Sequence, residues 1–329
     1  MNRHSGTITL LLLLILALYG GGCHKHTDNP QPAPPDPGPP VDTGTHSSDT
    51  LPFAVYLGGY IYEQNGDQVG AYWINDSIVK MPEIGIVTSI QTSGKNIYLS
   101  CYGHSEDLPF YYKNGRQVRI PNARIIGDIC VVGDDVYATG VDSSYINRYW
   151  KNDTMYTLEG LDGHQGYATH DKIYVIGADV YVTGSLHSTG AIWKNGKVTL
   201  YPSTGGIASM AIIGNDLYAG GFMYISSVCY FKNGQQIDID PTGLSAGNYI
   251  IPTPEGIAVV CENGNGASFL YQDGQAYPLD IEGLSTYTAS SDNSYIAGTS
   301  YKTGKVMVWK NGIITEKPYS GRIFCVYAH

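Results

Sequence analysis

The sequence predicts an all-β fold, a seven-bladed β-propeller built from four-stranded antiparallel blades. Two signatures carry this prediction. Each of them occurs seven times along the 329-residue chain, and half-units stand at the two ends of the array. After an apolar run near the N-terminus, no stretch shows the helical period of apolar residues. Units of about 40 residues that hold four short strands are typical of propeller blades.

The first signature predicts a tight hairpin between the third and fourth strands of each blade. It places an aromatic or aliphatic pair before a polar residue, then Asn or Asp, then Gly or Asp. Asn-Gly, Asn-Asp and Asp-Gly supply the positive-φ residues that a two-residue hairpin turn needs. The copies span residues 72–76, 111–115, 149–153, 192–196, 230–234, 270–274 and 308–312.

The second signature predicts the second strand of each blade. It is a short apolar strand with a central Tyr in most copies and a terminal Gly or Cys, and in five copies a Gly- or Asp-containing turn precedes it. An apolar or small-residue strand lies before that turn and supplies the first strand. The copies span residues 55–59, 97–101, 136–140, 180–184, 217–221, 257–261 and 294–298.

The two ends of the array predict how the ring closes. The first unit begins at its second strand, Ala54–Gly59, and the chain finishes with a lone first-type strand, Arg322–His329. We expect strands two to four from the N-terminus to pair with this C-terminal strand, because the pairing completes one blade and leaves no sheet edge exposed.

The first 52 residues predict export and a tether. Residues 1–22 carry Arg3 near their start, then an apolar run of nine residues, and they end in three glycines before Cys23. This order of features resembles a bacterial lipoprotein signal. The resemblance implies that Cys23 is acylated and that the protein is lipid-anchored in the bacterial cell envelope, at the outer membrane. Residues 23–52 hold seven prolines and predict an extended spacer. Residues 53–329 form the propeller.

The repeat motif also carries a resemblance to a family. The aromatic-Lys-Asn-Gly turn, the glycine-ended strand and the lipoprotein signal together resemble bacterial exported β-propeller proteins with W-x-N-G units, such as the extracellular HAF repeats. The resemblance covers residues 53–329. It implies an architecture and an exported location, and it supplies no catalytic residues.

The connections between strands two and three, and between successive blades, differ from repeat to repeat and should lie on one face. Variable loops on a rigid scaffold are where binding residues concentrate. We therefore expect the ligand on this face or at the mouth of the central channel. The candidate residues are His104, Glu106, Asp107, Asp142, Tyr145, His164, Tyr167, His187, Tyr224 and Tyr301.

The candidate chemistry favours binding over catalysis. The histidines lack metal-ligand spacing, no Gly-x-Ser-x-Gly motif is present, and no Ser or Cys stands in an activating context. The sequence thus predicts no metal, no cofactor and no catalytic residue. We expect a non-catalytic binding or scaffolding propeller that recognises a glycan or a protein. The alternative is a propeller lyase or hydrolase that acts on extracellular polysaccharide.

The net charge limits the possible partners, and the cysteine content limits the possible disulfides. The net charge of −10 argues against nucleic acid as a partner, and it leaves the lipid as the only hold on a membrane. A monomeric domain is expected. Five cysteines remain in the propeller: Cys101, Cys130, Cys229, Cys261 and Cys325. We favour buried free thiols for all five. If an exported protein formed one disulfide, Cys101–Cys130 would be the least implausible pair.

Overall fold

The chain divides into two units, Met1–Ser47 and Ser48–His329, and every described residue belongs to the second. The predicted signal peptide, Cys23 and the tether lie outside the described residues. The computed structural model describes residues 54–103, 109–161, 172–202, 204–223, 228–240, 247–253, 256–262, 267–272, 275–282, 284–289, 294–300, 302–310 and 313–328.

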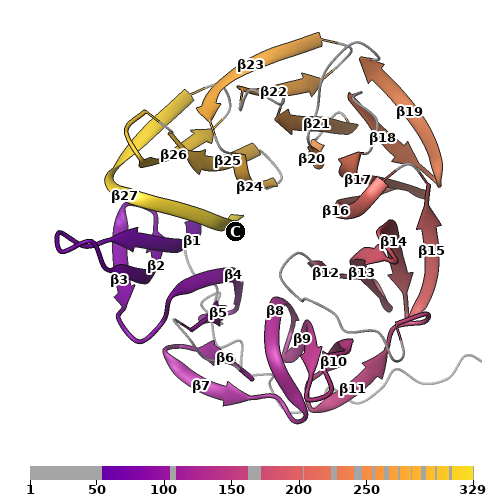
Figure 1. Ribbon diagram of the computed structural model, residues 1–329, viewed down its shortest axis with the longest axis horizontal. Helices are drawn as coiled ribbons and strands as arrows, with labels where there is room; N and C mark the ends of the chain where they lie inside the picture. The colour runs from indigo at the N-terminus through magenta and orange to yellow at the C-terminus, as the bar shows by residue number, and fades with distance from the viewer. Residues whose placement is uncertain are drawn as a thin grey trace, which may run out of the picture. The chain divides into compact units, whose positions relative to one another are not determined.

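Ser48–His329 is an all-β propeller whose sheets are arranged around a central axis (Figure 1). Five sheets have four antiparallel strands each, in sequential order from the axis outward. Their strands are β4 (Ile86–Ser93), β5 (Asn96–Tyr102), β6 (Phe110–Lys113) and β7 (Arg116–Arg119); β8 (Ala123–Val132), β9 (Asp135–Asp142), β10 (Asn147–Lys151) and β11 (Thr154–Thr157); β12 (Lys172–Ile176), β13 (Asp179–Leu186), β14 (Thr189–Lys194) and β15 (Lys197–Tyr201); β16 (Thr204–Ile213), β17 (Asp216–Met223), β18 (Val228–Lys232) and β19 (Gln235–Asp240); β20 (Gly247–Thr253), β21 (Gly256–Glu262), β22 (Ala267–Gln272) and β23 (Gln275–Glu282).

The sixth sheet has seven strands and contains both ends of the propeller. Its strands are β24 (Leu284–Ala289), β25 (Ser294–Thr299), β26 (Lys305–Lys310), β27 (Ile313–Ala328), β1 (Val55–Tyr62), β2 (Gln68–Ile74) and β3 (Ser77–Met81), in that order. β27 pairs with β26 along its first half and with β1 along its second half. The expected pairing of the C-terminal strand with the N-terminal strands is therefore confirmed.

The predicted count of seven separate blades is wrong, because the structure has six sheets. All seven hairpin repeats are present, but two of them share the seven-stranded sheet. The cause is β27, which runs for 16 residues without a break. The sequence pattern predicted a blade boundary before Arg322. Pro318 near that point is instead accommodated in a register shift, since Lys305 pairs with Ser320 and Met307 pairs with Glu316.

The asparagine of the hairpin turn exchanges two hydrogen bonds with one residue at the start of the second strand, as a paired strand residue would. Asn195 has a φ of 50°, its N–H donates to the carbonyl of Val180 at 2.8 Å, and its side-chain Oδ1 accepts from the N–H of Val180 at 2.8 Å. The turn thereby pairs with the start of the second strand. The same exchange joins Asn75 to Val55, Asn114 to Ile97, Asn152 to Val136 and Asn233 to Leu217.

The glycine that ends the second signature faces a bulge in the first strand. A Cβ on Gly140 would lie 2.0 Å from the carbonyl oxygen of Ile125, where β8 has a register shift. A Cβ on Gly59 would lie 1.9 Å from the carbonyl oxygen of Arg322 in β27. No side chain fits there unless the bulge shifts, so this close approach explains the glycine of the motif.

The core consists of apolar clusters between neighbouring sheets. Trp150 of β10 packs with Tyr98 of the preceding sheet and with Ile129 of its own first strand. Trp193 of β14 packs in the same way with Tyr137 of β9. Six of the seven clusters take residues from two sheets, and the seventh joins the two repeats of the seven-stranded sheet, so a repeat buries its aromatic face only when its neighbour is in place. Within the described parts of the chain, no helix is long and apolar enough to cross a membrane.

Candidate functional site: the loop face, the turn face and the axial cavity

Three of the ten predicted binding residues lie in the described parts of the chain, in or beside connections between second and third strands. Asp142 is the last residue of β9, Tyr145 belongs to the following β9–β10 connection, and His187 belongs to the β13–β14 turn. The other seven lie outside the described residues; they are His104, Glu106, Asp107, His164, Tyr167, Tyr224 and Tyr301.

Asp142 holds its own loop together. One carboxylate oxygen accepts from the N–H groups of Ser144 at 2.8 Å and Ile146 at 3.0 Å. The other oxygen accepts from Nε of Arg148 at 3.0 Å, and both side chains of this ion pair are buried. The carboxylate therefore shapes the turn, and Tyr145 depends on that shape for its position.

Tyr145 and His187 present side chains to solvent from strained backbone positions. Tyr145 has a φ of 61° and is 43% exposed, and the guanidinium of Arg124 lies 4.1 Å from the centre of its ring. Such cation–π contact fixes the ring orientation. His187 is exposed at a φ of 51°. A non-glycine residue in this region costs about 1–3 kcal/mol and points to a tightly constrained turn.

The opposite face of the propeller carries a repeated charged network at the hairpin turns. Nζ of Lys194 lies 2.7 Å from Asp179 and sits over the ring of Tyr181, while Nδ2 of Asn195 donates to Asp179 at 2.7 Å. These hydrogen bonds from Lys194 and Asn195 lower the pKa of Asp179. The same network recurs at Asp135 with Lys151, Tyr137 and Asn152, and at Asp216 with Lys232, Tyr218 and Asn233.

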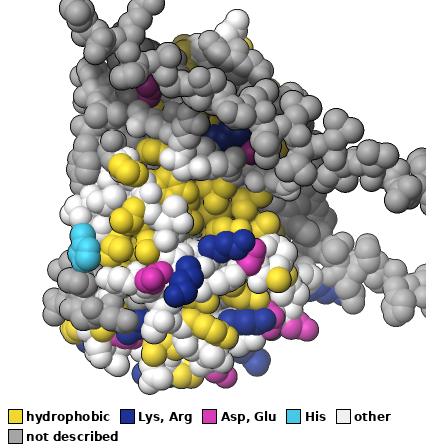
Figure 2. All heavy atoms as spheres, turned by 90° about the vertical axis from the view of Figure 1, so that its right-hand side faces the viewer, with side chains coloured by type: hydrophobic (Ala, Val, Ile, Leu, Met, Phe, Trp, Pro, Cys, Tyr) yellow, Lys and Arg dark blue, Asp and Glu magenta, His cyan; other side chains and the backbone are white. Residues whose placement is uncertain are grey.

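This pairing leaves the turn face without a concentrated charge. Figure 2, which views the molecule from its rim, shows the same mixture of basic and acidic side chains among hydrophobic and uncharged groups. The Asp-x-Tyr and Lys-Asn residues of the two signatures thus bind one another. The turn face is a structural surface, and a ligand is better sought elsewhere.

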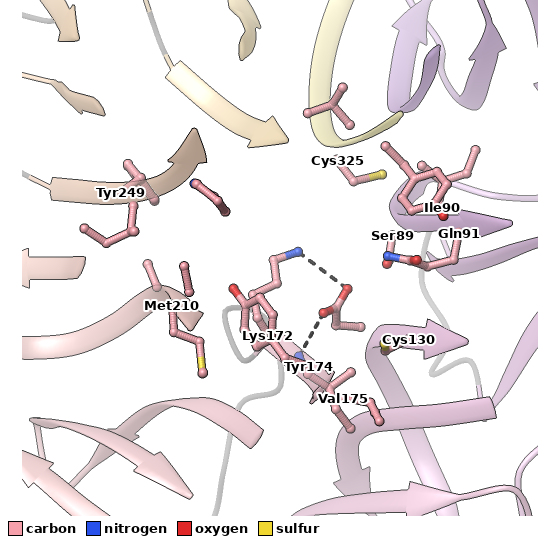
Figure 3. Close-up of a pocket in the computed structure, with 18 of the residues that line it drawn as sticks. Ser89, Ile90, Gln91, Cys130, Lys172, Tyr174, Val175, Met210, Tyr249 and Cys325 are labelled. Carbon is pink, nitrogen blue, oxygen red and sulfur yellow. Dashed lines mark hydrogen bonds and ion pairs between the residues drawn. The ribbon is translucent and has the colours of Figure 1, made fainter. Parts of the chain in front are cut away.

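The axis of the propeller holds a cavity of about 450 Å³. It is lined by residues of the innermost strands β4, β8, β12, β16, β20 and β27 (Figure 3). Apolar and aromatic side chains dominate, among them Met210 and Tyr249 on one side. Ser89 and Gln91 add polar groups on the other side. This size and mixture fit a small ligand or a narrow segment of a larger one.

Asp128 of β8 and Lys172 of β12 form an ion pair in the wall of the cavity. Asp128 is buried; its Oδ2 accepts from the N–H of Ile173 at 3.0 Å, and its Oδ1 lies 3.6 Å from Nζ of Lys172. In Figure 3 a dashed line joins the amine of Lys172 to this carboxylate. The side chain of Lys172 is 36% exposed. Lys172 can therefore donate to a second acceptor while it neutralises Asp128.

The residue after the bulge of the first strand ties neighbouring sheets together. Asp128 contacts β12 as described, Ser209 accepts from the N–H of Ile250 at 2.8 Å, and Ser89 donates to the carbonyl of Ile129 at 3.5 Å. Cys325 stands in the same position of β27, opposite Gly58. None of these cavity-lining residues was among the candidates predicted from the sequence. A usable signal was a polar residue inside an otherwise apolar strand, as in Asp128-Ile-Cys-Val-Val.

None of the five cysteines in the propeller forms a disulfide. Burial raises the pKa of Cys325 to about 12 and that of Cys130 to about 11, so both thiols that line the cavity stay protonated at neutral pH. Among the described residues, no group of three or more His, Cys, Asp or Glu side chains could hold a metal ion. In comparisons with known proteins, no family model and no curated sequence matches this chain.

Proposed function

We propose that this protein is a non-catalytic binding or scaffolding propeller that recognises a glycan or a protein partner through its loop face and the mouth of its axial cavity. One observation carries the proposal, the contrast between two kinds of connection. The described Asn-containing hairpins between third and fourth strands all use two-residue turns with one hydrogen-bond pattern. The connections between second and third strands range from two residues in the β13–β14 turn to seven between β5 and β6.

That contrast is typical of a scaffold that holds variable loops. Repetition on one face keeps the sheets in place, while freedom of length and residue type on the other face permits recognition. Tyr145 illustrates the second face, because Asp142 and Arg124 hold an exposed ring in a fixed orientation. The resemblance to exported repeat propellers and the predicted acylation of Cys23 would place this face outside the cell, held by lipid at the outer membrane.

Thermal unfolding of the full chain against a panel of polysaccharides, oligosaccharides and divalent metals tests the proposal. A ligand at about 100 times its dissociation constant stabilises the folded state by about 2.7 kcal/mol. For a domain of this size that corresponds to a shift of roughly 5–10 °C. Each positive ligand is then followed for product release. Saturable binding without turnover supports the proposal, and release of shortened saccharide contradicts it in favour of the lyase or hydrolase.

Cell fractionation tests the proposed anchor separately. The wild-type chain should partition with membranes, and Cys23→Ala should move it to the soluble fraction, because an acidic domain has no electrostatic hold on an anionic membrane. Cys130→Ala is the matched control, since it removes a cysteine that lies within the propeller. A Cys23→Ala variant that still sediments with membranes would contradict lipid anchoring and leave the binding proposal intact.

A further inference from the structure

The seven-stranded sheet contains a groove at the point where its two repeats join. Elsewhere the chain leaves one sheet through a connection before it enters the next, as at Pro121 between β7 and β8 and at Glu159 after β11. In β27 the chain stays in the strand while it passes from the outer position of one repeat to the inner position of the next. We call this point, residues 317–321 of β27 with the facing parts of β1, β2 and β3, the seam.

A missing hydrogen bond marks the seam as different from the other junctions. The indole N–H of Trp150 donates to the carbonyl of Pro121 at 3.2 Å, and that of Trp193 donates to the carbonyl of Glu159 at 2.9 Å. Both acceptors lie in the connection that precedes the tryptophan's own repeat. Trp73 is equally buried, yet its N–H has no partner among the described residues. Because β27 continues from one repeat into the next, no separate connection is present there to supply the acceptor.

The groove at the seam has a volume of about 700 Å³ and opens to solvent. Its walls are the end of β1 with the following turn, β3, and the middle of β27. The residues that carry the argument are Tyr62, Glu63, Gln64, Lys80 and Tyr319.

Two tyrosine rings in the groove are held by other aromatic residues. Tyr62 is 51% exposed and packs edge-on against Tyr60, with ring centres 5.3 Å apart. Tyr319 contacts the buried ring of Trp73 at 6.3 Å between centres. Tyrosine offers a large flat surface at a low cost in conformational entropy, and here packing lowers that cost further.

The polar groups of the groove are charge-balanced. Lys80 donates to a carboxylate oxygen of Glu63 at 2.7 Å, and both side chains remain partly exposed. Gln64 is exposed beside them and adds an amide that both donates and accepts. The groove therefore presents hydrogen-bonding groups of both kinds without a net charge that would select an ionic ligand.

We infer that this groove binds a neutral saccharide. The faces of a pyranose ring carry C–H groups that stack on aromatic rings, and its hydroxyls donate and accept at the edge, which matches rigid tyrosines beside an amide and a paired carboxylate and amine. An anionic saccharide fits less well, because Glu63 neutralises the charge of Lys80 and its carboxylate would repel a second anion. This inference deepens the proposed function and rests on it, since it selects a glycan and assigns its site.

Binding of the full chain to neutral hexasaccharides tests the inference, with cellohexaose, xylohexaose, laminarihexaose, mannohexaose and chitohexaose as probes and hexagalacturonate as the anionic probe. We expect at least one neutral probe to bind with saturation. Tyr62→Ala should then weaken binding at least tenfold, because a stacked ring is lost, whereas Tyr62→Trp should preserve it. Gln64→Ala should weaken binding severalfold.

Tyr277→Ala is the matched control, because Tyr277 is 46% exposed on a different sheet and its removal should leave the affinity unchanged. The unfolding midpoints of Tyr62→Ala and Tyr277→Ala should agree within about 1 °C, as expected for surface substitutions. Two results overturn the inference and leave the proposed function standing. One is saccharide binding that survives Tyr62→Ala, which places the glycan site elsewhere. The other is no binding to any neutral probe together with capture of a protein partner. Failure of the chain to bind either class overturns both proposals.

Discussion

The five four-stranded sheets and the seven-stranded sheet contain the same repeat but join it differently. Between four-stranded sheets, a connection crosses from the outer strand of one repeat to the inner strand of the next and supplies carbonyl acceptors to the buried indoles of Trp150 and Trp193. At the seam a single strand replaces the connection, the indole of Trp73 has no acceptor among the described residues, and a groove opens. A repeat sequence therefore specifies its hairpins, while the connecting residues decide whether two repeats become one sheet or two.

The largest expected effect comes from removal of the strand that closes the seam. Deletion of Arg322–His329 removes the pairing with β1 and the buried side chains of Ile323, Cys325 and Val326. Fully burying one such side chain contributes about 1.5–3 kcal/mol. We expect a loss of at least about 5 kcal/mol, or loss of cooperative unfolding, in thermal and denaturant melts.

Deletion of only Ala328 and His329 is the control for this truncation, because it keeps the three buried side chains. It should lower stability far less. If the long deletion unfolds like the intact chain, the pairing of β27 with β1 does not close the propeller, and the seam does not differ in stability from the other junctions.

The next largest loss of stability is expected from a single methyl group added to a glycine that faces a bulge. This substitution tests whether the sheet beside the seam is as tightly packed as a four-stranded sheet. Gly59→Ala and Gly140→Ala each place a Cβ within 2.0 Å of a backbone carbonyl oxygen, one where β1 pairs with β27 next to the seam and one inside a four-stranded sheet. Each should cost at least about 3 kcal/mol, because backbone must move. Gly206→Ala is the matched control, since its nearest neighbour lies at 3.7 Å. Urea melts that show a clearly smaller cost at Gly59 would mean that the sheet beside the seam yields more easily.

Replacement of the tryptophans measures the missing hydrogen bond directly. Trp150→Phe and Trp193→Phe remove the indole donor and leave a carbonyl without its partner, whereas Trp73→Phe removes a donor that had no described partner. A net hydrogen bond contributes about 1 kcal/mol. We therefore expect the first two variants to lose about 1 kcal/mol more than the third in chemical denaturation. Equal losses at all three positions would show that the indole of Trp73 finds an acceptor in solution.

The smallest effect concerns the turn face and its pH dependence. Hydrogen bonds from Lys194 and Asn195 hold the pKa of Asp179 below its ordinary value of 3.8. A carboxyl group whose pKa is lowered by folding stabilises the folded state above its ordinary pKa, and this contribution is lost as the pH falls below 3.8 and through the folded value. Asp179→Asn should flatten the fall of the unfolding midpoint in this acidic range, by a small amount because the pair is exposed.

Asp76 gives the corresponding measurement at the seam. Its pKa is also lowered, by a hydrogen bond and charge from Lys317 of β27 in place of the turn network. Asp76→Asn should therefore flatten the same acidic range. The measurement is the slope of the unfolding midpoint against pH in this range. If Asp179→Asn changes that slope and Asp76→Asn does not, the ion pair between Asp76 and Lys317 adds nothing to the stability of the folded state.

The sequence predicted those features that depend on one repeat alone. Asn195 and its equivalents need a positive φ, and Gly140 needs the absence of a side chain, so turn and bulge are visible as motifs. The number of sheets was missed because it depends on whether residues around Pro318 break the strand, and a register shift absorbs that proline.

The candidate site was less predictable because it depends on ring geometry. Asp128 and Lys172 lie 44 positions apart and meet only at the axis, where strands of different repeats converge. Tyr62 and Tyr319 come from opposite ends of the repeat array and line one groove only after closure. No local pattern links such pairs. Conversely, Asp142 was a candidate on the basis of its loop, although its oxygens are engaged by that loop.

The pairing of β1 with β27 also has a consequence for the order in which the protein can be made. A ribosome releases Val55–Tyr62 early, but the partner of that strand lies about 260 residues further along the chain. At about 5–20 residues per second, synthesis of that interval takes roughly 13–50 s. During this time the inner edge of β1 has hydrogen-bonding groups and no partner, so β27 must be synthesised before the first strand can complete its pairing. Closure of the propeller therefore waits for β27, and a chain that stalls before this strand is left with an unpaired strand edge at β1.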